Sequence, residues 1–278
     1  MVANDDEINT IFNLLDINVD KIIKIKTLAN FLVKVETNKG NYFLKIYDSK
    51  NEAKTGFKLA HLYPLLLKNN IPVPKVIKYD DSLELVKHPY LIITEIEGKM
   101  LCEVINTMSN EEKISFYYEF GKIVAKIHSI TFNKFGEVLD GKTVESYSEA
   151  NNKGPFSSWK DTHREIIDHR LSIFQGSYFE DLIKPIRSWF NKNKPLIDYN
   201  IIPRLLHDDL NQKNVFLKNH QISGIIDFDN AFIGHNEEEL MRTETANFLN
   251  DNNLRKSFFK GYMGIVKLDN NYEKRRIS

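Results

Sequence analysis

Two short polar segments in the second half of the chain carry residue types that could perform chemistry. The first contains Asp209 and Asn214, five residues apart, and the second contains Asp227. Phosphoryl transfer requires a carboxylate near the attacking hydroxyl and oxygen ligands for one or two Mg²⁺ ions that bridge the phosphates. These three side chains would supply that set. Because Asp and Asn are also common in turns, the first segment taken alone fits an ordinary turn equally well.

The order and spacing of the two segments resemble the aminoglycoside phosphotransferase and choline kinase family, which is related to the protein kinases. The family loop His-x-Asp-x-x-x-x-Asn is matched at His207, Asp209 and Asn214, and its Ile-Asp-(Trp/Phe)-(Asp/Gly/Glu) motif is matched at residues 226–229. The resemblance implies that Asp209 is the catalytic base and that His207 supports the loop. It also implies that Asn214 and Asp227 bind Mg²⁺.

Residues of the first hundred positions resemble the nucleotide-binding half of the same family. Lys45 ends an apolar segment, where the family places the lysine that contacts the α- and β-phosphates, and Glu52 would be its ion-pair partner. The segment that contains Glu95, Ile96 and Glu97 resembles the family's hinge strand, whose backbone would bind the base of ATP or GTP.

Three features depart from the family pattern. Asp208 stands where the family usually has glycine, and Asn211 stands where it often has histidine. The phosphate-covering segment, residues 27–31, contains no glycine, although Asn30 matches an asparagine often found there. Neither Asp208 nor Asn211 is a proposed chemical group, so these two departures bear on the substrate and the rate rather than on the class of reaction.

Acidic residues near the second motif are candidates for substrate contact. Glu238 and Glu239 occupy the place of a family segment that selects the substrate, and we also include Asp229 among the candidates. Carboxylates there would suit a cationic acceptor. The alternative is a solvated helix start, where acidic side chains interact favourably with the positive end of the helix dipole. Trp159 is better explained as a core aromatic than as a ligand contact.

The elements that would position these residues form two lobes. Residues 1–97 are expected to form an N-terminal nucleotide-binding lobe, a sheet with one helix, and residues 98–278 a mainly helical lobe with the catalytic loop, the metal motif and the substrate site. The fold class is therefore α+β, with the two-lobe, protein-kinase-like arrangement that the resemblance implies. We expect a long loop over residues 132–158 and a small hairpin within 201–233. Strands are expected over 21–26, 31–37, 42–47, 75–79 and 90–96, and helices over 51–69, 110–129, 159–174 and 179–193.

The amino-acid composition limits which partners, metal sites and cellular locations are expected. The 278 residues include 38 basic and 38 acidic side chains, and this balance argues against nucleic acid or a membrane surface as a partner. The single cysteine, Cys102, excludes an intramolecular disulfide and a cysteine-rich metal site. The first residues are acidic rather than basic, unlike a secretory signal, and a cytoplasmic location is expected. The oligomeric state is not indicated.

Three functions compete on these observations. The leading one is a Mg²⁺-dependent kinase that phosphorylates a hydroxyl of a small molecule, favouring an aminoglycoside-like antibiotic, with choline, homoserine or a ketosamine as alternatives. The second is a pseudokinase-like module that binds nucleotide without turnover, which the glycine-free segment favours slightly. The third is a two-metal hydrolase that uses Asp208, Asp209, Asp227 and Asp229, but it leaves Lys45 unexplained.

Overall fold

The computed structural model describes residues 3–25, 31–248 and 251–276. The chain divides into two compact units. The first unit comprises Met1–Val104 and Val215–Asp229, and the second comprises Ile105–Asn214 and Asn230–Ser278. In this division residues 215–229 pack with the first unit, although they lie within the predicted C-terminal lobe. The division into functional lobes after residue 97 stays a prediction.

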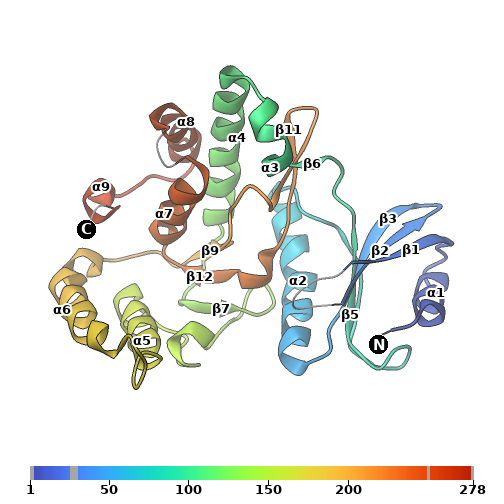
Figure 1. The fold of residues 1–278 in the computed structure, drawn as a ribbon, viewed down its shortest axis with the longest axis horizontal. Helices are drawn as coiled ribbons and strands as arrows, with labels where there is room; N and C mark the ends of the chain where they lie inside the picture. The colour runs from blue at the N-terminus through green and yellow to red at the C-terminus, as the bar shows by residue number, and fades with distance from the viewer. Residues whose placement is uncertain (1–2, 26–30, 249–250, 277–278) are drawn as a thin grey trace. The chain divides into compact units, whose positions relative to one another are not determined.

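A five-stranded antiparallel sheet forms the centre of the first unit (Figure 1). The strand order is β1-β2-β3-β5-β4. Side chains alternate between its two faces, and Val33, Val35, Leu44 and Ile46 are fully buried on one of them. The expected β2–β3 hairpin is confirmed, with Thr37 paired to Gly40. The strands are β1 (Val19–Ile25), β2 (Phe31–Thr37), β3 (Gly40–Ile46), β4 (Val76–Asp80) and β5 (Tyr90–Thr94).

Two helices flank this sheet, although only one was expected from the sequence. The expected helix is α2 (Lys50–Lys68), and the additional one is α1 (Asp5–Asn13). Asn4 and Glu7 form a capping box at the start of α1, since each side chain accepts a hydrogen bond from the other's backbone N–H. The apolar face of α1 packs against the fully buried face of the sheet.

A smaller sheet completes the first unit. Its strand order is β11-β10-β6, from β6 (Lys99–Met100), β10 (Val215–Lys218) and β11 (Gln221–Ile225). β10 and β11 are the expected hairpin, and a 3₁₀ turn, η5 (Phe228–Asn230), follows them. The backbone N–H of Ile225 donates to the carbonyl oxygen of Pro72, 2.8 Å away, which ties the hairpin to the segment after α2. The short helix α3 (Leu101–Val104) also belongs to this unit.

The core of the second unit contains a close pair of helices, α4 (Asn110–His128) and α8 (Asn252–Met263), which lie side by side in Figure 1. The predicted N-cap of α4, Ser109, is confirmed. Glycines permit the close approach. A Cβ atom at Gly121 would lie 2.1 Å from the carbonyl oxygen of Phe258, and one at Gly261 would lie 2.0 Å from that of Tyr118. Any larger residue at either position would push the helices apart.

The region expected to be a long loop, residues 132–158, contains two short strands, so that expectation was partly wrong. These strands are too short and polar to show a two-residue period. They join a four-stranded sheet of order β8-β7-β12-β9, in which β12 lies next to β9. Its members are β7 (Gly136–Val138), β8 (Val144–Glu145), β9 (Arg204–Leu206) and β12 (Phe232–Gly234).

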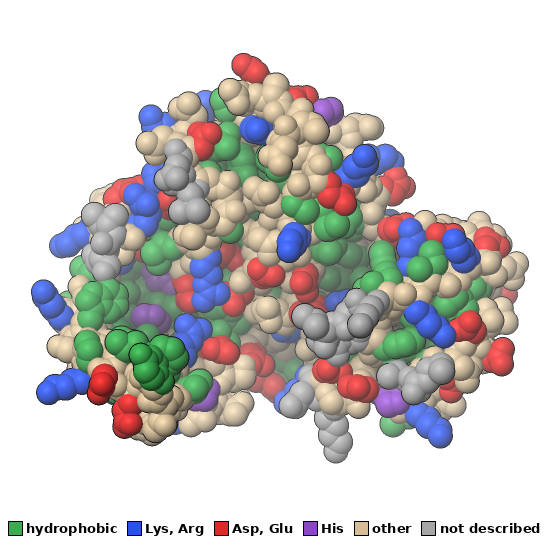
Figure 2. Space-filling model, viewed as in Figure 1, with side chains coloured by type: hydrophobic (Ala, Val, Ile, Leu, Met, Phe, Trp, Pro, Cys, Tyr) green, Lys and Arg blue, Asp and Glu red, His purple; other side chains and the backbone are tan. Residues whose placement is uncertain are grey.

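Helices surround this sheet and complete the second unit. They are α5 (Trp159–Ser172), α6 (Ile183–Asn193), α7 (Asn236–Asn247) and α9 (Tyr272–Arg276), with 3₁₀ turns η1 (Ile105–Thr107), η2 (Ser148–Ala150), η3 (Glu180–Leu182) and η4 (Lys194–Ile197). No helix within the described ranges is long and apolar enough to cross a membrane. Side chains of both charge signs are interspersed on the face drawn in Figure 2.

Candidate active site

The loop that follows β9 holds the carboxylate of Asp209 between two amide groups. Nδ2 of Asn211 donates to Oδ1 of Asp209 over 2.7 Å, and Nδ2 of Asn214 donates to Oδ2 over 2.9 Å. The same Asn214 nitrogen donates to the backbone carbonyl of Asp209 over 2.9 Å. Each carboxylate oxygen has a second lone pair. Asp209 is thus fixed in place while it keeps the capacity to accept a proton.

His207 and Asn214 frame this carboxylate. His207 is fully buried, and its Nδ1 accepts a hydrogen bond from the backbone N–H of Asp209 over 3.2 Å. This contact suits the supporting role that was predicted for the imidazole. Because Asn214 uses its amide nitrogen toward Asp209, its side-chain oxygen is directed elsewhere, and that oxygen makes no hydrogen bond with any residue the structure describes. An amide oxygen of this kind is a suitable ligand for Mg²⁺.

Asp208 has a backbone conformation that glycine adopts more easily than other residues, which explains why the family usually has glycine at this position. Its φ angle is +70°, in the left-handed region, where non-glycine residues are uncommon. Its carboxylate pairs with Arg242, and its backbone N–H donates to Oε1 of Glu239 over 2.5 Å. Burial raises the pKa of Asp208 to about 7, although the positive charge of Arg242 acts to lower this pKa. Asp208 is therefore a strained, partly buried acid next to the predicted base.

Glu239 connects the catalytic loop to the end of α4. It is 1% exposed, and its Oε2 lies 2.6 Å from Nε2 of His128. The other ring nitrogen of His128 bonds the hydroxyl of Tyr262 over 2.8 Å. Burial alone would raise the pKa of Glu239, but the hydrogen bond and charge of His128 outweigh it, so the pKa is lowered. Both carboxylate oxygens of Glu239 are already hydrogen-bonded within the protein. Glu239 is therefore better suited to support the loop than to contact a substrate, which was its predicted role.

His128 and Tyr262 were not predicted as site residues from the sequence. A histidine near the end of an amphipathic helix carries no sequence signal that separates it from an ordinary core residue. Its partner Glu239 is 111 residues away in the chain, so only the fold brings the two together.

In the first unit, Lys45 pairs with Asp229 and not with the predicted partner Glu52. Nζ of Lys45 lies 3.1 Å from Oδ1 and 3.3 Å from Oδ2 of Asp229. Lys58 donates to the backbone carbonyl of the same aspartate over 2.5 Å. Glu52 instead accepts a hydrogen bond from the backbone N–H of Asp48 over 3.3 Å. Asp229, a candidate for substrate contact, thus takes the position expected for Glu52.

A cavity of about 440 Å³ opens beside this ion pair within the first unit. Lys45, Asp227 and Asp229 contribute charged groups to its lining. A cavity of this size with apolar walls and a few polar groups is typical of a small-molecule site. Its apolar walls include Leu32, Phe43, Tyr63, Ile93, Ile96 and Phe216.

Glu95 and Ile96 of the predicted hinge line this cavity. The N–H of Glu95 donates to the carbonyl of Asn41, and its carboxylate accepts from Lys34 and Asn41, each over 2.7 Å. The carbonyl of Glu97 accepts from Ser223 over 2.6 Å. Among the described residues, nothing hydrogen-bonds to the carbonyl of Glu95 or accepts from the N–H of Glu97. Asn30, predicted to lie near the phosphates, falls outside the described residues.

The three successive glutamates at the start of α7 have different surroundings. Glu237 forms two hydrogen bonds with Arg275, each 2.6 Å long, and Glu239 faces His128. Glu238 accepts from Arg242 at Oε1 over 2.8 Å, but its Oε2 is buried without a hydrogen-bond partner. Of the predicted substrate residues, Glu238 is therefore the one with an unused oxygen.

The two-metal hydrolase receives no support from the geometry. In the part of the chain that the structure describes, no group of three or more His, Cys, Asp and Glu side chains could hold a metal ion. A Mg²⁺ ion would instead rely on a mixed set with the amide oxygen of Asn214, which is the set that the resemblance implied.

The similarity of the chain to known proteins agrees with the family resemblance of its sequence motifs. The profile of the phosphotransferase enzyme family matches residues 26–276. A homoserine kinase from Bartonella tribocorum is 25% identical over 206 residues, which is 72% of this chain and 55% of that protein. The chain thus spans about half the length of this relative.

Solved structures resemble the chain over nearly its whole length. The complex of gentamicin with APH(2″)-IIa has a TM-score of 0.69 at 19% identity, covering 99% of this chain and 85% of that one. A thermostable mutant of aminoglycoside phosphotransferase APH(4)-Ia, in a ternary complex with ADP and hygromycin B, has a TM-score of 0.68 at 15% identity, covering 93% and 82%. The predicted α+β, protein-kinase-like two-lobe fold is confirmed.

Proposed function

The chain belongs to the phosphotransferase enzyme family, and from this we propose that it transfers the γ-phosphate of ATP or GTP to a hydroxyl of a small molecule. The observation that carries the proposal is the carboxylate of Asp209, which Asn211 and Asn214 hold in place while each oxygen keeps a lone pair. A fixed carboxylate that can accept a proton is what activation of an alcohol requires.

In this reaction Asp209 acts as the base. The acceptor oxygen forms a bond to the γ-phosphorus while the bond from that phosphorus to the β–γ bridging oxygen breaks. The hydroxyl proton passes to Asp209, and the nucleoside diphosphate leaves. Lys45 would contact the phosphates, and the backbone of residues 95–97 would bind the base. Asn214 and Asp227 would hold Mg²⁺, which when bound neutralises charge on the phosphates.

The acceptor that we propose carries an amino group in addition to the hydroxyl. The support comes from Glu238, whose buried Oε2 has no hydrogen-bond donor of its own. Aminoglycoside-like antibiotics, choline-like amino alcohols, homoserine and ketosamines all combine a hydroxyl with a cationic nitrogen. The relative named a homoserine kinase and the structural relatives bound to gentamicin or hygromycin B make these compounds reasonable first choices.

The test is nucleotide consumption by the purified protein with Mg²⁺, with and without a panel of these acceptors. Asp209→Asn should retain nucleotide binding and lower acceptor-dependent transfer by roughly 10²- to 10⁴-fold, the range for loss of a positioned base. Asp181→Asn, at an exposed position in the second unit, is the matched control and should leave the rate unchanged.

Two results would contradict the proposal. One is undiminished transfer by Asp209→Asn, which would remove its role as base. The other is nucleotide binding without turnover for any acceptor of the panel, which would support a nucleotide-binding module instead.

A further inference from the structure

Arg242 on α7 contacts the residue that precedes the predicted base. Its Nη1 donates to Oδ1 of Asp208, and its Nη2 donates to Oε1 of Glu238 over 2.8 Å. The two acceptors belong to different segments, since Asp208 lies in the catalytic loop and Glu238 lies one turn before Arg242 on α7. One guanidinium group thus ties the catalytic loop to the helix.

The backbone of Asp208 is in a conformation that needs such a tie. Its φ angle is +70°, in the left-handed region, where the Cβ atom comes too close to the backbone. For a residue other than glycine, this conformation is disfavoured by a factor of about 5 to 30. Aspartate adopts it when its short side chain gains a hydrogen bond that compensates for the strain.

Two contacts hold Asp208, and only one of them depends on the residue type. The backbone N–H donates to Oε1 of Glu239 over 2.5 Å, and glycine would make the same bond. The side chain, in contrast, has Arg242 as its single hydrogen-bond partner within the described part of the chain. The bond to Arg242 therefore compensates for a strain that glycine, the usual residue at this position in the family, does not have.

This contact does not require ionised carboxylates. Burial raises the pKa of Asp208 to about 7, and it also raises the pKa of Glu238. A neutral carboxyl group keeps a carbonyl oxygen that accepts a hydrogen bond, so the guanidinium group has acceptors in either protonation state. The tie from Arg242 to the loop therefore persists on both sides of neutral pH.

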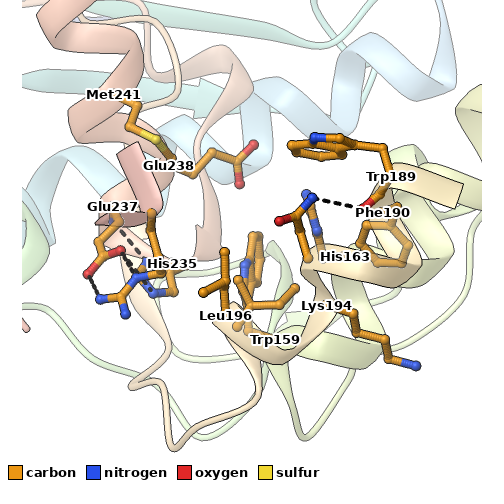
Figure 3. Close-up of a pocket in the computed structure, with 13 residues that line it drawn as sticks. Trp159, His163, Trp189, Phe190, Lys194, Leu196, His235, Glu237, Glu238 and Met241 are labelled. Carbon is orange, nitrogen blue, oxygen red and sulfur yellow. Dashed lines mark hydrogen bonds and ion pairs between the residues drawn. The ribbon is translucent and has the colours of Figure 1, made fainter. Parts of the chain in front are cut away.

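Glu238 holds the other end of the guanidinium group. Figure 3 shows its carboxylate at a cavity of about 190 Å³, which lies between α5, α6, η4 and the start of α7. Because residues four apart on a helix are neighbours on its surface, the bond from Nη2 to Glu238 restricts the orientation of the arginine. Nη1 is thereby kept in place for Asp208.

We propose that Arg242 is a positioning residue, which holds the left-handed backbone of Asp208 and thereby the orientation of the Asp209 carboxylate. The backbone N–H of Asp209 donates to Nδ1 of His207, so a change of conformation at Asp208 would also displace that hydrogen bond. The inference rests on the proposed function, because it takes Asp209 as the base.

The first test needs no substrate. Hydrogen exchange, followed by mass spectrometry on the peptide of residues 207–214, measures how readily the loop opens. Arg242→Gln removes the guanidinium group from a side chain that is 43% exposed, and it should speed exchange of the loop by about 5- to 30-fold. Arg164→Gln makes the same change at a side chain that is 44% exposed on α5, and it should exchange as the wild type does.

The decisive comparison repeats Arg242→Gln in the background of Asp208→Gly, which completes a double-mutant cycle. Glycine adopts the left-handed backbone without strain, so the arginine has nothing left to compensate there. Arg242→Gln should then change the exchange of the loop by less than about twofold. An effect of equal size in both backgrounds, or no effect in the wild-type background, would overturn the inference.

Turnover supplies a second measurement, in the assay of the proposed function. In the wild-type background Arg242→Gln should lower kcat by about 5- to 30-fold and leave KM for the nucleotide unchanged, whereas in the Asp208→Gly background kcat should change by less than about twofold. Loss of kcat in both backgrounds would show that the arginine acts by another route, which overturns the inference.

The outcome is separable from that of the proposed function. Exchange that depends on Arg242 only in the presence of Asp208, in a protein that transfers no phosphate, would support the tie and contradict the kinase. Transfer that depends on Asp209 but is unaffected by Arg242→Gln would support the kinase and overturn the positioning role.

Discussion

The ammonium group of Lys45 lies 3.1 and 3.3 Å from the two carboxylate oxygens of Asp229, although 184 residues separate them in the chain. This contact joins β3 to the turn after the β10–β11 hairpin. It leaves the lysine at the wall of the larger cavity, beside Asp227. A phosphate group that binds there must share the donors of Lys45 with Asp229.

Replacement of Lys45 by alanine should therefore weaken productive nucleotide binding. We expect kcat/KM for the nucleotide to fall by about 10- to 100-fold, because charge-assisted hydrogen bonds to phosphate are lost. Steady-state kinetics with varied nucleotide would measure the change. Lys78→Ala, on β4 of the same sheet with 45% of its side chain exposed, should behave as the wild type. Normal rates of Lys45→Ala at low nucleotide would exclude the phosphate-contacting role.

Replacement of Glu239 by glutamine should loosen the catalytic loop. The carboxylate is buried and holds both His128 and the backbone N–H of Asp208. Loss of its charge should reduce the free energy of unfolding by about 3 kcal/mol, as expected when one partner of a buried pair is removed. It should also lower kcat while KM for the nucleotide stays unchanged.

Glu238→Gln is the natural comparison for this variant, because it alters the preceding residue of the same helix. Burial raises the pKa of Glu238, whereas the pKa of Glu239 is lowered, so neutralising Glu238 should cost little stability. Urea unfolding of both variants would measure the difference. Equal stability losses would show that the bond to His128 does not distinguish the two positions.

Asp208→Asn should change how stability depends on pH. The pKa of this carboxyl is raised from 3.8 to about 7, so the folded chain binds the proton more tightly than the unfolded chain does. Stability of the wild type is therefore lost as the pH rises from about 4 to 7. Asparagine does not titrate and tolerates the left-handed backbone, so the variant should gain stability relative to the wild type across this range.

The measurement is the urea midpoint of both proteins at pH 4.5 and pH 7.5. Because a tenfold change in proton affinity corresponds to about 1.4 kcal/mol, the relative gain should reach a few kcal/mol. The exposed Asp181→Asn variant controls for general effects of pH. A difference between Asp208→Asn and the wild type that is the same at both pH values would contradict the raised pKa.

Arg275→Ala should destabilise the second unit. Arg275 is 8% exposed at its side chain, binds both oxygens of Glu237, and lies 4.7 Å from the centre of the Tyr199 ring. Removing it leaves the buried carboxylate of Glu237 without its partner, which should lower the free energy of unfolding by about 3 to 5 kcal/mol. Arg164→Ala, at an exposed ion pair, should change it by less than about 1 kcal/mol. Similar unfolding midpoints for the two variants would refute this.

The sequence grouped His207, Asp209 and Asn214 as one candidate set, and the structure places these three residues in contact within one loop. Their roles in chemistry stay a prediction. Long elements with a clear period, such as α2 and α4, were also predicted to within a few residues. The short helix α1 was missed although its capping signal, Asn4 and Glu7, is present in the sequence.

Partners that are chosen by the fold could not be predicted. Lys45 was expected to pair with Glu52, seven residues away, and it pairs with Asp229 instead. The bond between His128 and Glu239 depends on how α4 and α7 are brought together. The functions of Glu237, Glu238 and Glu239 are indistinguishable by residue type, and only their surroundings separate them.

The different contacts of these three glutamates determine which substitutions on α7 the fold can tolerate. Successive residues of an α-helix point about 100° apart, so neighbours on α7 face different parts of the molecule. Glu237 holds Arg275, and Glu239 holds the backbone N–H of Asp208. Glu238 borders the cavity between α5, α6 and α7, and its Oε2 has no hydrogen-bond partner among the described residues. A substitution at position 238 is therefore expected to change the lining of that cavity while the contacts of Glu237 and Glu239 remain.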